Sequence, residues 1–69
     1  MSIGQIGEEI KVRRQFLDLR QEDLAEMSGI ATKTIHLIES GSGNPSVETL
    51  EKLATVLGME LILQIKKMG

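Results

Sequence analysis

The side chains that could carry covalent or metal chemistry are few, and the single histidine, His36, is the first to consider. The chain has no cysteine, which excludes disulfides and thiolate ligands, and one histidine disfavours a zinc site built from protein ligands alone. The helix predicted around His36 carries no nucleophile and no supporting carboxylate arrangement for catalysis. Gly41-Ser42-Gly43 lacks the following helix pattern of a dinucleotide motif. The sequence therefore predicts no enzyme activity, no metal and no cofactor.

A second set of residues has the spacing of two short helices that meet at a tight turn. Counted from Gln21, a small residue is fifth, a glycine is ninth, and apolar residues are fourth, fifteenth and eighteenth, which are Ala25, Gly29, Leu24, Ile35 and Ile38. Ala25 lets the helices approach closely, Gly29 makes the turn, and the apolar residues fix the crossing angle. This geometry places the second helix in the major groove of DNA. A hairpin in an unrelated bundle could match parts of the pattern, but this chain has all of it.

The first two helices that hold this motif follow from periodicity and capping. Apolar residues at helical intervals predict an amphipathic helix from about Ile3 to Phe16. A short helix follows over residues 21–28, because its acidic first turn suits the positive end of the helix dipole. Gly29 then takes the left-handed conformation that ends it.

The third and fourth helices frame a loop over residues 40–45, whose glycines and proline forbid helix continuation. Thr32 is predicted to cap a helix from Lys33 to about Glu39. Ile35 and Ile38 share one face of it, and the residues away from that face are Lys33, Thr34, His36 and Leu37. Ser46 is predicted to cap the fourth helix, which Gly58 ends and whose apolar stripe is Val47, Leu50, Leu53, Ala54 and Leu57.

The tail, residues 59–67, alternates apolar and other residues with period two, which predicts a β-strand. Its backbone groups need a partner, and the simplest is the same strand of a second copy, paired antiparallel across a two-fold axis. A fifth helix packed on the core is the alternative. The residues expected to dimerise are Met59, Leu61, Ile62, Leu63 and Ile65.

Length and composition predict a single domain. The helix and strand patterns above make it a compact all-α domain of four helices over residues 1–58, followed by the dimerisation strand over residues 59–67. A 69-residue chain is near the lower size limit for an unaided core, so oligomerisation is expected to help. The sequence has neither a signal-peptide pattern nor an apolar run of about 20 residues that could span a bilayer. A soluble, cytoplasmic protein without a membrane partner is expected.

The net charge is −2, but its distribution is uneven. Residues 11–20 carry a net charge of +3, whereas residues 41–60 carry −2. A basic segment is what binding to phosphate requires. Such fluctuations occur in any helical protein, so charge alone leaves the question of DNA binding open.

Residues 10–58 resemble the phage-repressor and Cro type of helix-turn-helix domain, the XRE family. The match lies in Arg14, Leu19-Arg20-Gln21, Leu24-Ala25, Gly29-Ile30, Ile35, Ile38-Glu39-Ser40-Gly41, Asn44-Pro45-Ser46, Leu50 and Leu57-Gly58. The resemblance implies that base edges are read by Thr32, Lys33, His36 and Leu37. Lys33 can donate to guanine O6 and N7, Thr32 can contact thymine, and His36 can donate to an acceptor edge. Leu37 either packs on a thymine methyl or covers the helix.

The same resemblance implies roles for the residues around this helix. Arg14 and Glu39 are expected to form a structural ion pair that orients it. Gln21 is expected to hold a phosphate and to support a neighbouring base-reading side chain. The further phosphate contacts are expected at Arg20, Thr34, Ser40, Ser42 and Asn44. For Lys11 and Arg13 a solvated face and a DNA contact are equally open.

The C-terminal residues 57–65 resemble a subset of the family, the HipB-like antitoxins. That resemblance implies a homodimer that binds a palindromic operator of its own operon in double-stranded DNA, and that also binds a toxin, commonly a protein kinase. The chain departs from the subset in having almost no tail beyond Lys67. Three hypotheses stay open: an autoregulatory antitoxin, a stand-alone repressor, and an interaction module that does not bind DNA.

Overall fold

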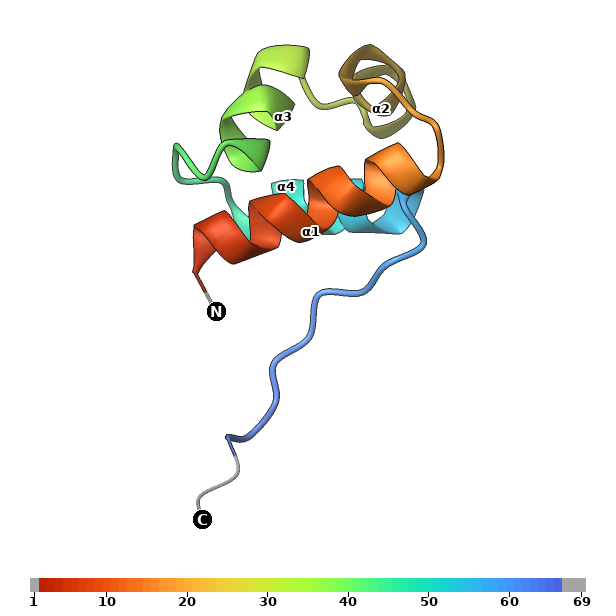
Figure 1. The fold of residues 1–69 in the computed structure, drawn as a ribbon. Coiled ribbons are helices and arrows are strands. Elements are labelled where there is room, and N and C mark those ends of the chain that lie inside the picture. Colours follow the sequence, from red (N-terminus) through yellow and green to blue (C-terminus); the bar gives the residue numbers. More distant parts are fainter. Residues whose placement is uncertain (1, 67–69) are drawn as a thin grey trace.

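The described part of the chain folds into four helices, with capping serines and turn-forming glycines at several of their ends. The computed structural model describes residues 2–66 and contains α1 (Ile3–Phe16), α2 (Gln21–Ser28), α3 (Thr32–Glu39) and α4 (Val47–Val56). The helix bounds predicted from the sequence for α1 and α2 are confirmed. α2 and α3 lie together on one side of the molecule, and α1 and α4 lie beneath them (Figure 1).

Serine side chains begin two of the helices. The Ser46 hydroxyl accepts a hydrogen bond from the Thr49 N–H at 3.0 Å, so the predicted cap of α4 is confirmed. Ser2 caps α1 in a reciprocal arrangement with Gln5, with bonds of 2.7 and 3.2 Å, and this cap was not predicted. The predicted cap of α3 is wrong: the helix begins at Thr32 and its N-cap is Ala31, without a side-chain hydrogen bond.

The turn between α2 and α3 is closed by Gly29, as its sequence position predicts. Gly29 is left-handed, with φ 76°, and its N–H donates to the carbonyl of Ala25 at 2.9 Å. The Ser28 hydroxyl donates to the Leu24 carbonyl at 2.6 Å and accepts from the Ile30 N–H at 3.2 Å. The turn residues therefore satisfy the free polar groups at the end of α2 and hold α3 close to it.

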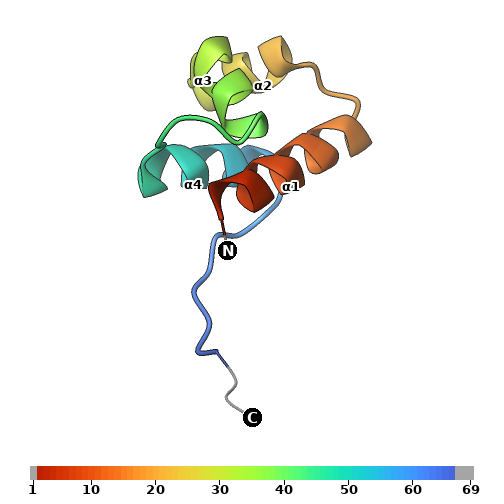
Figure 2. The ribbon, with the colours of Figure 1, turned by 60° about the vertical axis from the view of Figure 1, so that its left-hand side comes forward.

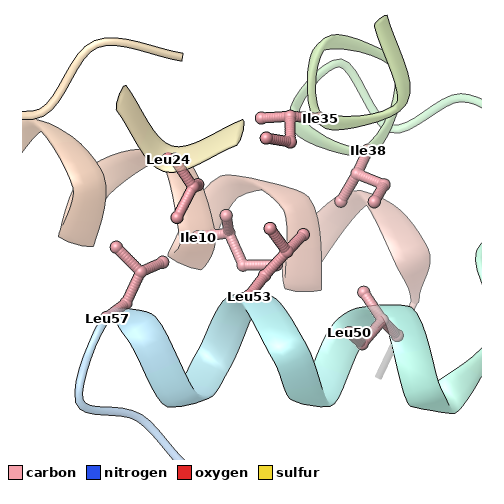
Figure 3. Packing of buried hydrophobic residues seen from close by; sticks show 7 residues of the cluster. All are labelled: Ile10, Leu24, Ile35, Ile38, Leu50, Leu53 and Leu57. Carbon is pink, nitrogen blue, oxygen red and sulfur yellow. The ribbon is translucent and has the colours of Figure 1, made fainter. Parts of the chain in front are cut away.

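One apolar core joins the four helices (Figure 3). Leu24 of α2 and Ile38 of α3 point toward α4, and Leu53 of α4 points back at them. Ile35 of α3 and Leu57, the residue after α4, belong to the same cluster. All five side chains are fully buried. Val47 is exposed, so the apolar stripe predicted for α4 is buried only from Leu50 onward. Burial of side chains from every helix fixes how α3 sits on the rest of the domain.

The tail is where the structure departs from the predicted fold. The helical body ends at Gly58, which is left-handed, and residues 59–66 extend away from the helices without strand pairing (Figure 2). Met59 and Leu61 pack partly on the core, whereas Leu63 and Ile65 are fully exposed. The predicted strand is thus not formed in the single chain, because a strand exists only through hydrogen bonds to a neighbour. Position 67 of that prediction lies outside the described residues.

Candidate nucleic-acid interface

Helix α3 has a buried face and a free face. Ile35 and Ile38 are buried in the core, and Glu39 is buried beside them. The free face is made of the four residues predicted to read bases, all of them exposed: Thr32, Lys33, His36 and Leu37. Leu37 is 38% exposed, the lowest value among the exposed large apolar side chains, and Leu17 has the same value. The side chains that can donate hydrogen bonds to a ligand therefore stand on the outer side of a helix that the core holds from behind.

The loop after α3 is tied to the end of that helix. The Ser40 hydroxyl and the Ser42 N–H both donate to the carbonyl of Leu37, at 2.9 and 2.8 Å. Ser40, Ser42 and Asn44 are exposed, whereas Thr34 is half-buried on the flank of α3. Ser40 and Ser42 are thus linked to Leu37 on the free face of α3, so this helix orders the start of the loop.

Arg20 does not present a free charge in this structure. Its guanidinium donates to the two carboxylate oxygens of Asp23 at 3.0 and 3.2 Å, and its N–H donates to Asp23 Oδ2 at 2.8 Å. The hydrogen bond to Asp23 raises the pKa of Arg20, and the same contact lowers the pKa of Asp23. A phosphate at Arg20 would have to compete with this carboxylate.

A buried ion pair joins α1 to α3. Arg14 Nε lies 2.7 Å from Glu39 Oε2, and Arg14 Nη2 lies 2.9 Å from Glu39 Oε1, so the guanidinium binds both oxygens. The third donor, Nη1, donates to the carbonyl of Leu19 at 2.7 Å. Arg14 is 9% exposed and Glu39 is 8% exposed. A bidentate pair of this kind fixes direction as well as distance, and it orients the last turn of α3.

Gln21 completes this network. Its Nε2 group donates to Glu39 Oε1 at 3.1 Å, so the first residue of α2 is linked to the last residue of α3. Burial raises the pKa of Glu39, but the hydrogen bonds from Arg14 and Gln21 and the positive charge of Arg14 outweigh it, and the pKa lies below its ordinary value. Gln21 was predicted to lie at the DNA backbone, and its contact with Glu39 was not predicted. Their separation of eighteen positions gives no local signal for such a bond.

A close backbone contact was also missed. A β-carbon on Gly7, in the middle of α1, would overlap the carbonyl oxygen of Ile38 in α3. Glycine inside a helix is unfavourable unless another backbone approaches it, so its presence in a predicted helix was the available signal. The contact sets the distance between α1 and the C-terminal half of α3.

Arg13 has a role that neither open alternative for it included. Its Nε donates to the carbonyl of Leu57 at 2.9 Å, and its guanidinium carbon lies 5.3 Å from the centre of the Phe16 ring. The side chain therefore caps the C-terminal end of α4, where carbonyls lack helical partners.

The described part of the chain has no group of three side chains placed to hold a metal ion. Among the same residues, no helix is both long and apolar enough to cross a membrane.

Comparisons with known proteins agree with this geometry. A model of the helix-turn-helix family HTH_3 matches residues 2–63. An uncharacterized HTH-type transcriptional regulator of Methanothermobacter thermautotrophicus is 39% identical over 56 residues, which cover 81% of each chain. A second such regulator, of Haemophilus influenzae, is 42% identical over 77% of this chain and 54% of its own length.

A solved structure shares the arrangement of the helices. It is described as the crystal structure of the master regulator for biofilm formation SinR in complex with DNA. The two chains are 36% identical, with a TM-score of 0.74, over 80% of this chain and 89% of that one.

Proposed function

The chain belongs to the XRE-type helix-turn-helix family HTH_3, whose relatives are named as transcriptional regulators, and we propose on that premise that it is a sequence-specific DNA-binding repressor. The observation that carries the proposal is the division of α3 into a face locked in the core and a free face of hydrogen-bonding side chains. The likeness to a regulator solved with DNA supports it.

In this proposal the free face of α3 lies in the major groove. Lys33 donates to guanine O6 and N7, Thr32 bonds a base edge or covers a thymine methyl, and His36 donates to an acceptor. Leu37 packs on a thymine methyl. The helix is rigid in advance because the core, the Arg14–Glu39 pair and the close contact at Gly7 all hold it. Binding to DNA therefore costs little conformational entropy, because the helix is already ordered in the free protein.

Phosphate contacts flank this helix and set its register on DNA. Gln21, at the start of α2, presents its backbone N–H and the second N–H of its side-chain amide to one phosphate, while the first amide N–H stays bonded to Glu39. The loop after α3 contacts further phosphates of the DNA backbone. The residues that we propose for these contacts are Arg20, Gln21, Thr34, Ser40, Ser42 and Asn44.

We further propose that two copies bind a palindromic operator, with residues 1–58 as the DNA-binding unit and residues 59–67 as the dimerisation segment. Antiparallel pairing of two extended tails supplies the hydrogen-bond partners that the single chain lacks. Two α3 helices about 34 Å apart then meet successive major grooves on one face of the duplex. The bound dimer represses by covering a promoter.

An autoregulatory antitoxin is the narrower candidate within this function. The observation that favours it is an open groove between α2 and α4, on a surface that the proposed DNA contacts leave free. Its lining includes the exposed Met27, the carboxylate of Glu51 and the ion pair of Glu48 with Lys52. A kinase-like toxin encoded by the neighbouring reading frame would co-purify with the chain, and Met27→Asp would abolish that complex without weakening DNA binding. A chain that binds DNA but not the neighbouring product is a stand-alone repressor.

The test of the proposed function is binding to a library of random duplexes followed by affinity measurements on the selected sequence. We expect a palindromic site to be selected, bound much more tightly than a scrambled duplex, with an affinity that falls steeply as salt rises. Binding of the selected and scrambled duplexes with equal affinity would remove sequence specificity from the proposal. Absence of binding at low salt would instead indicate a protein-interaction module.

A further inference from the structure

An apolar groove runs along the outer face of α1, beside the start of the tail. It is lined by Glu8, Glu9, Val12, Arg13, Phe16 and Met59. Phe16, the only aromatic residue of the chain, is 73% exposed, and Val12 is 55% exposed. A large ring left in water beside other apolar side chains is a feature of surfaces that meet a partner.

The groove is preformed in the single chain. Arg13 is one of the lining residues. Its Nε donates to the Leu57 carbonyl, and its guanidinium lies over the Phe16 ring. Met59 forms the end of the groove and also packs partly on the core. Arg13 therefore links the Phe16 ring to Leu57, two residues before Met59.

The tail of the same chain carries a second exposed apolar surface. Leu63 and Ile65 are fully exposed, and Ile62 is 60% exposed. The tail points away from α1 and α4 (Figures 1 and 2). Each copy thus has an empty apolar groove and an uncovered apolar tail that do not meet each other.

Strand register brings these two surfaces together in a dimer. An antiparallel pair centred on Ile62 places Leu61 opposite the partner's Leu63 and Met59 opposite the partner's Ile65. This register keeps all four side chains on one face of the two-stranded ribbon, the face on which Met59 and Leu61 already touch the core. Since Met59 lines the α1 groove, the partner's Ile65 arrives at that groove.

We propose that the α1 groove of each copy binds the tail end of the other copy, residues 63–66. The inference rests on the proposed dimer and extends its interface from the paired strands to the helical bodies. Ile65 contacts Phe16 and Val12, and Lys66 reaches the carboxylates of Glu8 and Glu9 at the rim. Neither carboxylate has an ion-pair partner among residues 2–66, so the charges are complementary.

The absence of native cysteine allows a direct test with single-cysteine variants. Phe16→Cys and Ile65→Cys chains are mixed and oxidised, and a disulfide forms only if the two positions come within about 7 Å between Cα atoms. We expect a disulfide-linked dimer containing one chain of each kind. The control mixes Ile65→Cys with Val47→Cys, since Val47 is similarly exposed but lies on α4 away from the groove, and no mixed dimer should form.

Two further variant chains distinguish failure of the groove inference from failure of the proposed dimer. Ile62→Cys should link to itself, because Ile62 lies at the two-fold axis of the proposed strand pair. If Ile62→Cys links but the Phe16 and Ile65 variants do not, the tail-paired dimer stands and the groove inference is overturned. An internal disulfide in a Phe16→Cys/Ile65→Cys chain that sediments as a monomer would show the tail folding back on its own groove, which also overturns it. If Ile62→Cys fails to link and the native chain is monomeric, the proposed dimer itself is wrong.

Discussion

Gly7 in α1 lies against the carbonyl group of Ile38 in α3, without room for a β-carbon between them. A β-carbon on Gly7 would overlap the carbonyl oxygen and lie only 2.9 Å from the carbonyl carbon. The backbones of the two helices are therefore in direct contact. Because α3 carries the proposed base-reading side chains, the side-chain volume at position 7 controls where that helix stands.

Gly7→Ala is predicted to destabilise the fold, because the added methyl must push α3 away. The expected loss in the free energy of unfolding is about 1–3 kcal/mol or more. Gly4→Ala is the matched control, since its β-carbon would make only an ordinary contact with Ser2 Oγ at 3.7 Å. That variant should gain roughly 0.5–1 kcal/mol from its better helix propensity. Urea unfolding measures both changes, and equal effects would refute the role of the contact.

The buried pair of Arg14 and Glu39 predicts a large loss from single substitutions. Arg14→Ala leaves the Glu39 carboxylate buried without its partner, which should cost about 3–5 kcal/mol. Glu48→Ala removes an exposed pair with Lys52 and should cost less than about 0.5 kcal/mol. The double variant Arg14→Met/Glu39→Leu should be more stable than Arg14→Met or Glu39→Leu alone. If its loss in the free energy of unfolding instead equals the sum of the two single losses, the charges do not act as a pair.

Acid should weaken the fold through Glu39. Because the folded state lowers the pKa of this carboxyl, its stabilising effect is complete above the unfolded pKa of about 4.3. The effect is lost as pH falls through the lower pKa of the folded state, where protonation breaks the bonds from Arg14 and Gln21. Urea midpoints measured from pH 7 to pH 2.5 should fall in this acidic window. Glu39→Gln, already less stable at pH 7, should show a smaller fall than the native chain.

Lys33 is predicted to read a base, and Gln21 is predicted to contact the DNA backbone. Lys33→Ala should weaken binding to the selected operator by about 1–3 kcal/mol and relax the preference at one base pair. Gln21→Ala should weaken binding to all duplexes alike. Lys52→Ala removes one positive charge from α4, outside the proposed interface, and should leave the preference unchanged. Anisotropy titrations against single-base operator variants separate these effects, and a uniform loss for Lys33→Ala would reassign it to a phosphate.

The exposed tail residues are predicted to act in dimerisation and not in folding. Leu63→Ser/Ile65→Ser should leave the unfolding of the helical body unchanged, because both side chains are fully exposed in the single chain. The variant should sediment as a monomer at concentrations where the native chain is a dimer, and it should bind the palindrome weakly. Val47→Ser, an exposed apolar residue of α4, serves as the control. A double variant that stays dimeric would place the interface elsewhere.

The helices and their order could be predicted from the sequence because the signals for them are local. Helical periodicity fixed Ile3–Phe16, Gly29 marked the turn, and Ser46 marked the start of α4. The same periodicity separated the buried Ile35 and Ile38 from the free face of α3, since residues three positions apart share one side of a helix. Even here, the start of α3 was misplaced by one residue because Thr32 has the chemistry of a cap but not its position.

The family resemblance implied one distant contact, the Arg14–Glu39 pair, and only the tertiary structure decided which other distant groups meet. The contact of Gly7 with Ile38, the bond from Gln21 to Glu39 and the bond from Arg13 to Leu57 depend on how the helices cross, which no short stretch of sequence encodes. In the tail, the sequence does carry a clear alternating pattern. That pattern alone does not form a strand, because a strand needs hydrogen bonds to a neighbouring strand. In the single chain that neighbour is missing, so residues 59–66 are extended and unpaired. Local pattern thus determined the elements of this protein, and packing between them determined the surface that they present.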